Sequence, residues 1–449
     1  MSKSDNRTRW RCIIRQMGQQ LPFFLDRVRL DQCGANQGIT MTELTKRDYF
    51  ADLDILRDPY PYFEAIRTKD GVFHDEERDI YFVTGFDTVV QALLDGDRLS
   101  SGIAVFGAKD IPKFGLNGAD VRSELAAFRK QHPMFDLLVN YDGQEHSNVR
   151  SLLSRLFTPT RIKSNEEYMA RLADEMIAEA VSEGKAEIVK GIAAPYVTLV
   201  IADLLGVPAD DREKFREVID KGPPAGNMTE NDERPADATL IYLGGFFMRY
   251  ITERKAQDMG DVMSELAHAS FPDGTTPDIL EVVKASMFLF AAGQDTSAKL
   301  VANSVRYLAE NPEMQDHLRK NPSDLAPFIE EMLRLEGSTK ATFRLALDDV
   351  KLGETTIPAG KPMVITLAAA NRDPDRWEQP AEFRLDRKKG NQHVSFGRGR
   401  HTCIGAALAR AEVKFLLGTL LRETSFISLD ETIHGDPHNR KLTYEPSYI

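Results

Sequence analysis

Residues 396–405 read Phe-Gly-Arg-Gly-Arg-His-Thr-Cys-Ile-Gly, and they lead directly into an apolar stretch at 406–421. We expect that stretch to be a helix beginning close to Cys403. A helix N-terminus offers unpaired N–H groups and the positive end of a dipole, so it favours a thiolate there. The glycines at 397, 399 and 405 would let the backbone turn tightly and approach a flat group closely. The arrangement suits a thiolate bound to iron.

A lone cysteine is more often a small buried hydrophobe than a ligand. The ten-residue context of Cys403 reverses that expectation. A zinc site is excluded because the only other cysteines are Cys12 and Cys33, and no Cys-x-x-Cys or clustered Cys/His spacing occurs.

The segment matches, at every fixed position, the pattern Phe-Gly-x-Gly-x-His-x-Cys-x-Gly of the cytochrome P450 superfamily, and it resembles that family's cysteine-ligand loop. The resemblance runs from about Asp58 to the C-terminus. It implies that Cys403 is the axial ligand of haem b, iron protoporphyrin IX, and that Phe396, Gly397 and Gly405 lie against this cofactor. It also implies a mainly α fold with a small β region, a helix-rich triangular prism around a buried haem.

Composition limits the organisation and the partners. The 449 residues would suggest two or three domains, but no long linker or repeat separates them, so we expect one haem domain at 41–449. Residues 1–40 would form a basic extension outside the fold. Three cysteines, no membrane span and a net charge of −12 predict a cytoplasmic protein that binds neither membrane nor nucleic acid. We expect it to be a monomer, although the sequence leaves the oligomeric state open.

The hydrophobic pattern is mostly helical. Strand-like alternation is confined to 80–84 and to segments between 344 and 367, where turns at 351–353 and 358–360 would fold hairpins. Helical periods and caps predict helices at 62–68, 86–94, 145–157, 164–183, 195–205, 210–221, 236–253 and 280–309.

Glu331 and Arg334 lie three residues apart on an apolar helical segment, so their side chains can pair. Such pairs occur on most helices. The position before the cysteine loop resembles the family's Glu-x-x-Arg signature, which implies a buried structural pair. The family often completes it with the arginine of Pro-x-Arg-Phe, but here Glu382 occupies that place and Arg384 follows. Which residue closes the network stays open.

Residues 291–297, Ala-Ala-Gly-Gln-Asp-Thr-Ser, interrupt a long apolar helix with small and polar side chains. A threonine hydroxyl that leaves its own helical turn can open a groove for dioxygen and water. The segment resembles the family's oxygen-binding element, which implies that Thr296 stabilises the reduced oxygen and that Asp295 relays protons. A helix kink with satisfied polar side chains is the alternative.

His146 and Arg150 are four residues apart, on one helix face. A lone histidine on a helix is usually an ordinary surface or core residue. The resemblance implies that both residues donate to a haem propionate, together with Arg344 and His401.

The resemblance places the substrate pocket at 103–135, 222–226 and 338–342, and at Phe288, Ala292 and Thr342. Phe106 and Phe114 would help to line it, which predicts a hydrophobic substrate of small to medium size. Lys340 and Thr339 could add a polar anchor, but exposed turn residues are the favoured interpretation.

The resemblance implies a monooxygenase that inserts one oxygen atom from O2 by hydroxylation or epoxidation. Its electrons would come from an acidic 2Fe-2S ferredoxin and its reductase, docked on a basic patch around the cysteine loop. Ordinary solvated charges are the alternative for that patch, whose members are Lys388, Lys389, Arg398, Arg400, Arg410 and Lys414. A peroxide-driven variant and a non-enzymatic haem sensor are the alternative functions.

Overall fold

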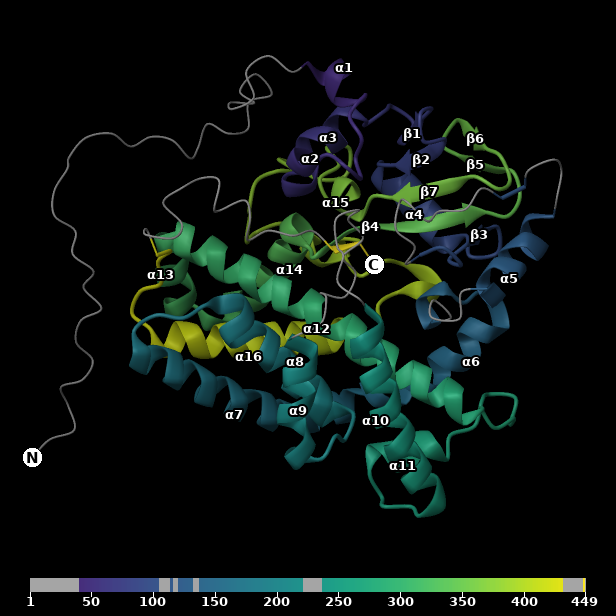
Figure 1. The fold of residues 1–449 in the computed structure, drawn as a ribbon. Helices are drawn as coiled ribbons and strands as arrows, with labels where there is room; N and C mark the ends of the chain where they lie inside the picture. Colours follow the sequence, from purple (N-terminus) through teal and green to yellow (C-terminus); the bar gives the residue numbers. More distant parts are fainter. Residues whose placement is uncertain are drawn as a thin grey trace, which may run out of the picture.

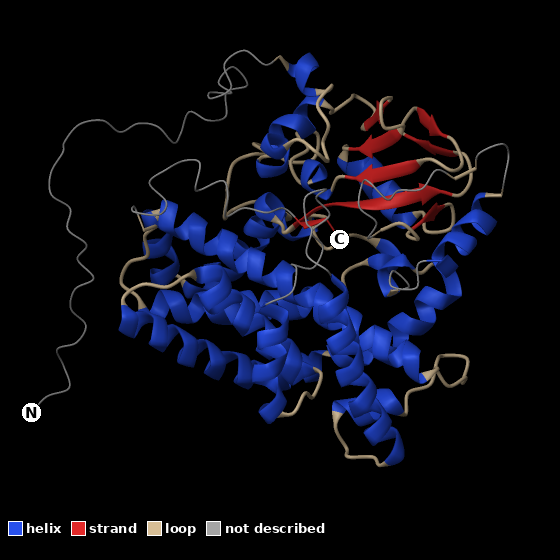
Figure 2. Cartoon of the chain, in the orientation of Figure 1, coloured by secondary structure: helices blue, strands red, loops and turns tan. Residues whose placement is uncertain are grey.

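The computed structural model describes residues 40–104, 114–115, 120–131, 137–220, 236–430 and 447–448. Helices fill most of this part of the chain, and the strands gather at one side (Figure 2). The α-helices are α1 (Met41–Leu44), α2 (Leu53–Arg57), α3 (Tyr60–Ala65), α4 (Phe86–Leu94), α5 (Val121–Gln131), α6 (Gly143–Ser154), α7 (Pro159–Glu183), α8 (Ala194–Leu204), α9 (Ala209–Asp220), α10 (Ala236–Ala256), α11 (Val262–Ala267), α12 (Ile279–Glu310), α13 (Pro312–Lys320), α14 (Leu325–Glu336), α15 (Leu367–Ala370) and α16 (Ala406–Glu423). A π-helix, η5 (Ile188–Ala193), leads into α8, and 3-10 helices are η3 (Leu138–Asn140), η4 (Arg155–Phe157), η6 (Pro322–Asp324), η7 (Gly390–Gln392) and η8 (Gly399–His401).

The fold expectation is confirmed: the chain is mainly α with a small sheet. All the predicted helices are present, and their ends differ by a few residues at most. Helix α7 begins earlier than predicted because the Thr158 hydroxyl caps its N-terminus and Pro159 fits the first turn. It ends at Gly184, whose φ of 86° suits a glycine C-cap.

Helix α12 is the long central helix. It begins with a capping box between Asp278 and Glu281, and it contacts α6, α8, α10, α14 and α16. Helix α16 packs between α12 and α7 (Figure 1). The buried apolar faces of these helices form one continuous core, in which Phe290, Leu300 and Leu417 are almost completely buried.

The strands form a six-stranded sheet and a separate two-stranded hairpin. The main sheet has the order β1-β2-β7-β4-β3, with β8 paired to β4, and β5 pairs with β6. Strands β2 and β7 run parallel, while β4 and β7 run antiparallel with Phe343 opposite Val364. The strands are β1 (Val72–Asp75), β2 (Ile80–Val83), β3 (Leu99–Ser100), β4 (Thr339–Ala346), β5 (Val350–Leu352), β6 (Thr355–Ile357), β7 (Pro362–Ile365) and β8 (Ser447–Tyr448).

The hairpin predicted at 351–353 is confirmed by the antiparallel pair β5–β6. The hairpin predicted at 358–360 is wrong, because β7 pairs with β4 and β2 instead of β6. The residues of β7 explain the choice: Met363, Val364 and Ile365 are completely buried, and such a strand belongs inside a sheet.

Among the described residues, no helix combines the length and the apolar character that crossing a membrane requires. The predicted extension at 1–40 lies almost entirely outside the described residues. Its boundary with a domain at 41–449 stays a prediction.

Candidate active site

The cysteine loop folds back on itself just before α16. The Cys403 N–H donates to the Phe396 carbonyl at 2.8 Å, so the segment closes into a compact loop. Gly397 and Gly399 have φ values of 67° and 73°, as the prediction of tight turns required. A Cβ on Gly399 would lie 2.8 Å from the Leu93 carbonyl oxygen, so the loop also needs glycine there for space.

Gly405 lies in the turn before α16, but it does not need a left-handed backbone. This residue is the N-cap of α16 and has an ordinary φ of −84°. A Cβ there would lie 3.9 Å from Phe157 and 4.0 Å from the Cys403 sulfur, which is normal contact. The loop itself therefore does not require glycine at 405.

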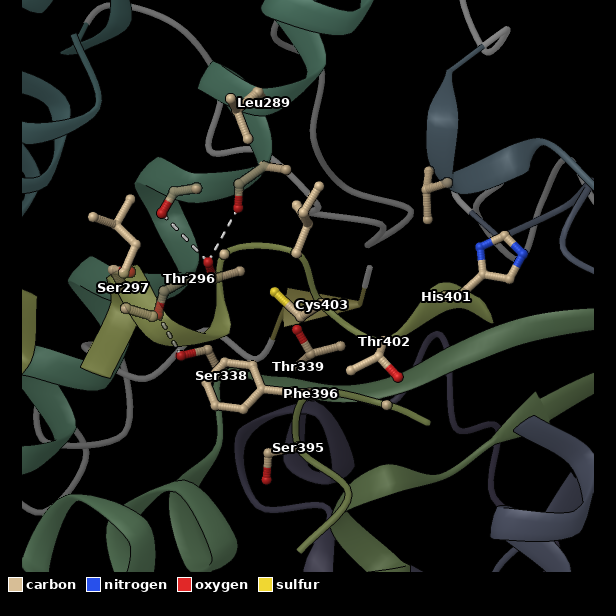
Figure 3. A pocket seen from close by; sticks show the side chains of 18 of the residues that line it. Leu289, Thr296, Ser297, Ser338, Thr339, Ser395, Phe396, His401, Thr402 and Cys403 are labelled. Carbon is tan, nitrogen blue, oxygen red and sulfur yellow. Dashed lines mark hydrogen bonds between the residues drawn. The ribbon is translucent and has the colours of Figure 1, made fainter. Parts of the chain in front are cut away.

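The Cys403 side chain is accessible through a cavity, into which its sulfur points (Figure 3). Burial raises the pKa of the Cys403 thiol, while a hydrogen bond from the Gly405 backbone and the charges of Arg150 and Arg410 oppose this effect. A bound metal cation deprotonates a coordinating thiol outright. Within the described part of the chain, Cys403 is the only cysteine, and no cluster of His, Cys, Asp and Glu could hold a metal instead.

The cavity lies between α12, the cysteine loop, α6 and the start of β4. Its empty volume is about 1460 Å³, including a part that opens to solvent. The structure brings together most of the predicted site residues in its wall: His146, Arg150, Phe288, Ala292, Thr296, Thr342, Arg344, Phe396, Gly397, His401, Cys403 and Gly405.

One end of the cavity carries an excess of donors. Arg344 is 4% exposed, and its guanidinium donates to the Phe343 carbonyl at 2.6 Å and to the Thr342 hydroxyl at 3.3 Å. Burial lowers the pKa of Arg344 to about 10. Among the described residues, no carboxylate forms a salt bridge with Arg344 or with Arg150, which donates to the Thr402 carbonyl at 2.7 Å.

Two histidines complete this end. The rings of His146 and His401 lie 4.1 Å apart, centroid to centroid, and His146 Nε2 is buried without a hydrogen-bond partner. Burial and then neighbouring arginines lower the pKa of His146 to about 4 and that of His401 to about 2. Buried donors without an anion fit a cofactor that carries carboxylates, as the propionates of haem do.

Helix α12 forms the wall opposite the sulfur. The Thr296 hydroxyl donates to the Ala292 carbonyl at 3.1 Å, and the Thr296 carbonyl accepts from Ser338 Oγ at 2.6 Å (Figure 3). The hydroxyl therefore stays on its own helical turn, which corrects the expectation that it leaves the turn. Packing explains the glycine at position 293, because a Cβ there would lie 2.6 Å from Ile201 Cδ1 of α8.

Asp295 is the predicted site residue that the structure does not bring into the cavity. Its carboxylate pairs with Lys299 Nζ at 2.8 Å, one turn along α12. Asp295 is absent from the cavity wall, although Thr296 and Ser297 both belong to it. Adjacent residues on a helix point in directions about 100° apart, so Thr296 and Asp295 do not share a face.

Glu331 and Arg334 form the expected buried pair, with bonds of 2.9 and 2.8 Å. The third member is Arg387, whose Nε donates to the Glu331 oxygens at 2.8 and 3.1 Å. Neither candidate considered from the sequence supplies its side chain: Arg384 donates only its backbone N–H, and Glu382 accepts from Arg334 with its backbone carbonyl. No local pattern marks Arg387, because the chain must first fold back for it to reach Glu331.

Lys340 is not an exposed turn residue. It lies on β4, is 1% exposed, and donates to the Tyr60 hydroxyl at 2.8 Å, away from the cavity wall. Thr339 does line the cavity. Phe114 is buried in a separate cluster beside the sheet. Phe106 and the segment 222–226 lie outside the described residues.

Sequence reasoning missed one buried acid in the cavity wall, Glu412 of α16. Its neighbours at four-residue spacing, Leu408 and Leu416, are apolar and buried. An acid within an apolar helical stripe was the signal that could have found it.

The basic patch predicted around the cysteine loop contains fewer unpaired cations than its residue list indicates, because two of its arginines pair with carboxylates. Arg410 pairs with Glu330 at 3.0 Å and packs over Phe396, and Arg400 pairs with Asp97 at 2.8 Å. Lys388, Lys389 and Lys414 are exposed, and Arg398 is partly exposed.

The chain resembles one family throughout. A family model described as Cytochrome P450 matches residues 325–447. Cytochrome P450 144 of Mycobacterium tuberculosis is 31% identical over 415 residues, covering 89% of this chain and 90% of that protein. Substrate-free CYP150A6 of Mycobacterium marinum is 40% identical with a TM-score of 0.83, covering 90% and 96%. CYP109E1 of Bacillus megaterium in complex with testosterone is 28% identical with a TM-score of 0.66, covering 81% and 91%.

Proposed function

The chain belongs to the cytochrome P450 family, and from that premise we propose its substrate class, its electron donor and the residues that act. It is a haem-thiolate monooxygenase. We propose that it hydroxylates or epoxidises a hydrophobic substrate of small to medium size. The observation that carries the proposal is the largely apolar cavity in which the Cys403 sulfur and Thr296 face the same space. When bound, haem supplies the activation of O2 and the transfer of one oxygen atom.

Cys403 holds the iron in this proposal. The loop supports it with Phe396, Gly397 and Gly405, which line the cavity next to the sulfur. The four donors at the other end, His146, Arg150, Arg344 and His401, hold the two propionates. This assignment gives the buried Arg344 charge an anionic partner and offers the unpartnered His146 Nε2 an acceptor.

The substrate occupies the space beside α12 and β4. Phe288, Ala292 and Thr342 contribute mainly apolar surface there, so they exclude water and favour a hydrophobic compound. The testosterone complex of CYP109E1 shows that a related fold accepts an apolar ligand of that kind.

Thr296 holds a proton at its hydroxyl beside the reacting oxygen. Replacing Thr296 by alanine removes that hydroxyl, and we expect electrons to be consumed with less product per electron, while Thr296→Ser retains coupling. Ser286→Ala is the matched control, because its hydroxyl makes the same bond to the fourth residue before it, the Val282 carbonyl, and lies outside the cavity wall. Equal coupling in the Thr296→Ala and Ser286→Ala variants would disprove the role of Thr296.

The thiolate assignment has a spectroscopic test. The reduced, carbon monoxide-treated protein should show the red-shifted Soret band of thiolate ligation, and Cys403→Ser should lose that band while the cavity still takes up haem. A haem-loaded wild-type protein without the band would refute the assignment.

An acidic ferredoxin is the proposed electron donor of this monomeric, cytoplasmic enzyme. It would dock on the exposed cations beside the cysteine loop and be steered there by charge. Charge reversal at Arg398 and Lys414 should weaken the dependence of the reduction rate on salt. Reversal at Lys255, which is exposed on α10, should leave that dependence unchanged. Unaltered salt dependence in the Arg398 and Lys414 variant would rule out this docking site.

One observation favours a peroxide-driven variant as the second candidate function. Asp295 is paired with Lys299 outside the cavity wall, so the expected acid is not in place to deliver protons. Turnover with hydrogen peroxide exceeding turnover with ferredoxin and reductase would support that variant.

A further inference from the structure

Ser338 connects the start of β4 to α12 at the level of Thr296. Its Oγ donates to the Thr296 carbonyl at 2.6 Å (Figure 3). Both residues line the cavity, and Ser338 lies one position before Thr339, the first residue of β4, which lines it too. The proposed function assigns a role to the Thr296 hydroxyl and leaves this bond to its carbonyl without one.

The turn of α12 that carries Thr296 is intrinsically weak. The Thr296 hydroxyl donates back to the Ala292 carbonyl at 3.1 Å and to the Gly293 carbonyl at 3.4 Å. Back-bonding of this kind slightly destabilises a helix and often bends it. Gly293 adds to the effect because glycine is a poor helix former. A hydrogen bond from outside the helix therefore restrains a turn that the helix alone holds loosely.

A second bond holds the same segment against α12. Asn303 Nδ2 donates to the Glu336 carbonyl at 3.0 Å. Thr296 and Asn303 are seven positions apart, about two helical turns, so they lie on one face of α12. Asn303 is not part of the cavity wall. Residues 336–338 are thus attached to α12 at two points, and the attachment at Ser338 is the one beside the cavity.

The other side of this segment packs against the residue that precedes the cysteine loop. A Cβ on Gly337 would lie 2.7 Å from the Leu333 carbonyl oxygen and 3.1 Å from Ser395 Oγ. Ser395 Oγ itself donates to the Leu333 carbonyl at 2.6 Å. This close packing leaves the segment little room to move, so its serine is a fixed anchor for α12.

We propose that Ser338 is a positioning residue for oxygenation: its hydrogen bond fixes the Thr296 turn of α12 relative to the wall of β4 against which the substrate lies. The carbonyl and the hydroxyl belong to one residue, so restraining the carbonyl of Thr296 also limits the positions of its hydroxyl beside the reacting oxygen. Without the bond the turn samples more arrangements, and fewer of them place the hydroxyl productively. This inference rests on the proposed monooxygenase function.

The first test requires no turnover. In the reduced holoenzyme with carbon monoxide, the infrared C–O stretching band reports on the polar groups beside the bound gas, the Thr296 hydroxyl among them. We expect a broader or split band in Ser338→Ala. The matched control is Asn303→Ala, which loses a side-chain hydrogen bond to the same segment and should keep the wild-type band. A wild-type band in Ser338→Ala would overturn the inference.

The second test measures the product formed per electron consumed. In Ser338→Ala this ratio should fall by about two- to tenfold, the range over which one intramolecular hydrogen bond shifts an equilibrium. Ser338→Thr retains a hydroxyl and should recover most of the loss. Asn303→Ala should keep the wild-type ratio, because its bond lies two turns from Thr296. Equal ratios in Ser338→Ala and Asn303→Ala would overturn the inference, because the serine bond would then only join two segments.

A double variant shows whether Ser338 acts through Thr296. Adding Ser338→Ala to Thr296→Ala should lower the ratio no further, because the hydroxyl that the bond positions is already absent. A full additional loss in the double variant would overturn the inference and assign Ser338 to direct contact with the substrate. A wild-type enzyme that forms no oxygenated product with ferredoxin would instead refute the proposed function, and the C–O band would still decide the role of Ser338.

Discussion

Replacing Arg387 by alanine tests which residue completes the buried network under the cysteine loop. The Arg387 side chain is 6% exposed and donates from Nε to both oxygens of Glu331, which is 2% exposed. Its remaining donors reach the carbonyls of Glu378, Gln379 and Glu382 at 2.6 to 3.2 Å. Arg384, three residues earlier, is 27% exposed and pairs with Asp386 on the surface.

The structure sets the size of the effect. Removing one partner of a buried ion pair costs about 3 to 5 kcal/mol. We expect Arg387→Ala to lose about 3 kcal/mol, the lower end, because Arg334 still pairs with Glu331. Arg384→Ala should lose about 0 to 1 kcal/mol, since exposed ion pairs contribute no more than this.

The measurement is the free energy of unfolding in urea, for wild type and both variants. Burial raises the pKa of Glu331, but hydrogen bonds from Arg334 and Arg387 outweigh it and hold the pKa below 4.5. The stability that this lowered pKa represents is present above 4.5 and is lost as pH falls through the folded-state value. The cost of Arg387→Ala should therefore shrink in acid. Equal costs for Arg387→Ala and Arg384→Ala at pH 7 would refute the assignment.

Three further substitutions test the cavity and its loop. Arg344→Ala should speed the transfer of haem from the holoenzyme to apomyoglobin at least tenfold; an unchanged transfer rate would contradict its role as a propionate donor. Gly399→Ala should reduce the fraction of protein with a thiolate-ligated haem spectrum, because φ is 73° and the Cβ would meet the Leu93 carbonyl at 2.8 Å; normal haem loading would count against this explanation of the loop. Gly293→Ala should change the free energy of unfolding in urea through two opposing effects. Overpacking against Ile201 costs about 1 to 3 kcal/mol, and the better helix propensity of alanine offsets about 1 kcal/mol of that cost. Adding Ile201→Val should recover part of that loss, and additive effects of the two changes would exclude the predicted contact.

Short motifs could be predicted from the sequence, because their residues stay together in any fold. The cysteine loop and the pair Glu331–Arg334 each lie within one local segment, and the structure confirms their geometry. The long helix around Thr296 was predicted almost to its ends, since its hydrophobic period and its caps are also local.

Contacts between residues that lie far apart in the chain could not be predicted from the sequence. Arg387 donates to Glu331, which lies 56 positions earlier in the chain. Lys340 is buried where it donates a hydrogen bond to the hydroxyl of Tyr60, 280 positions away. The pairing of Asp295 with Lys299 was local and could have been anticipated from the spacing of four. The resemblance to the oxygen-binding element implied a proton-relay role for Asp295, and that expectation did not include its pairing with Lys299.

The polar groups of the cavity are separated in a way that would orient a bound haem. Arg344 and Arg150 supply positive charge at one end without a carboxylate partner among the described residues, and the acid at the α12 side, Glu412, is mainly neutral at pH 7. Most of the remaining wall is apolar. A ligand with carboxylates on one edge and an apolar body gains ionic hydrogen bonds in only one orientation, because the reverse would bury its carboxylates without a partner.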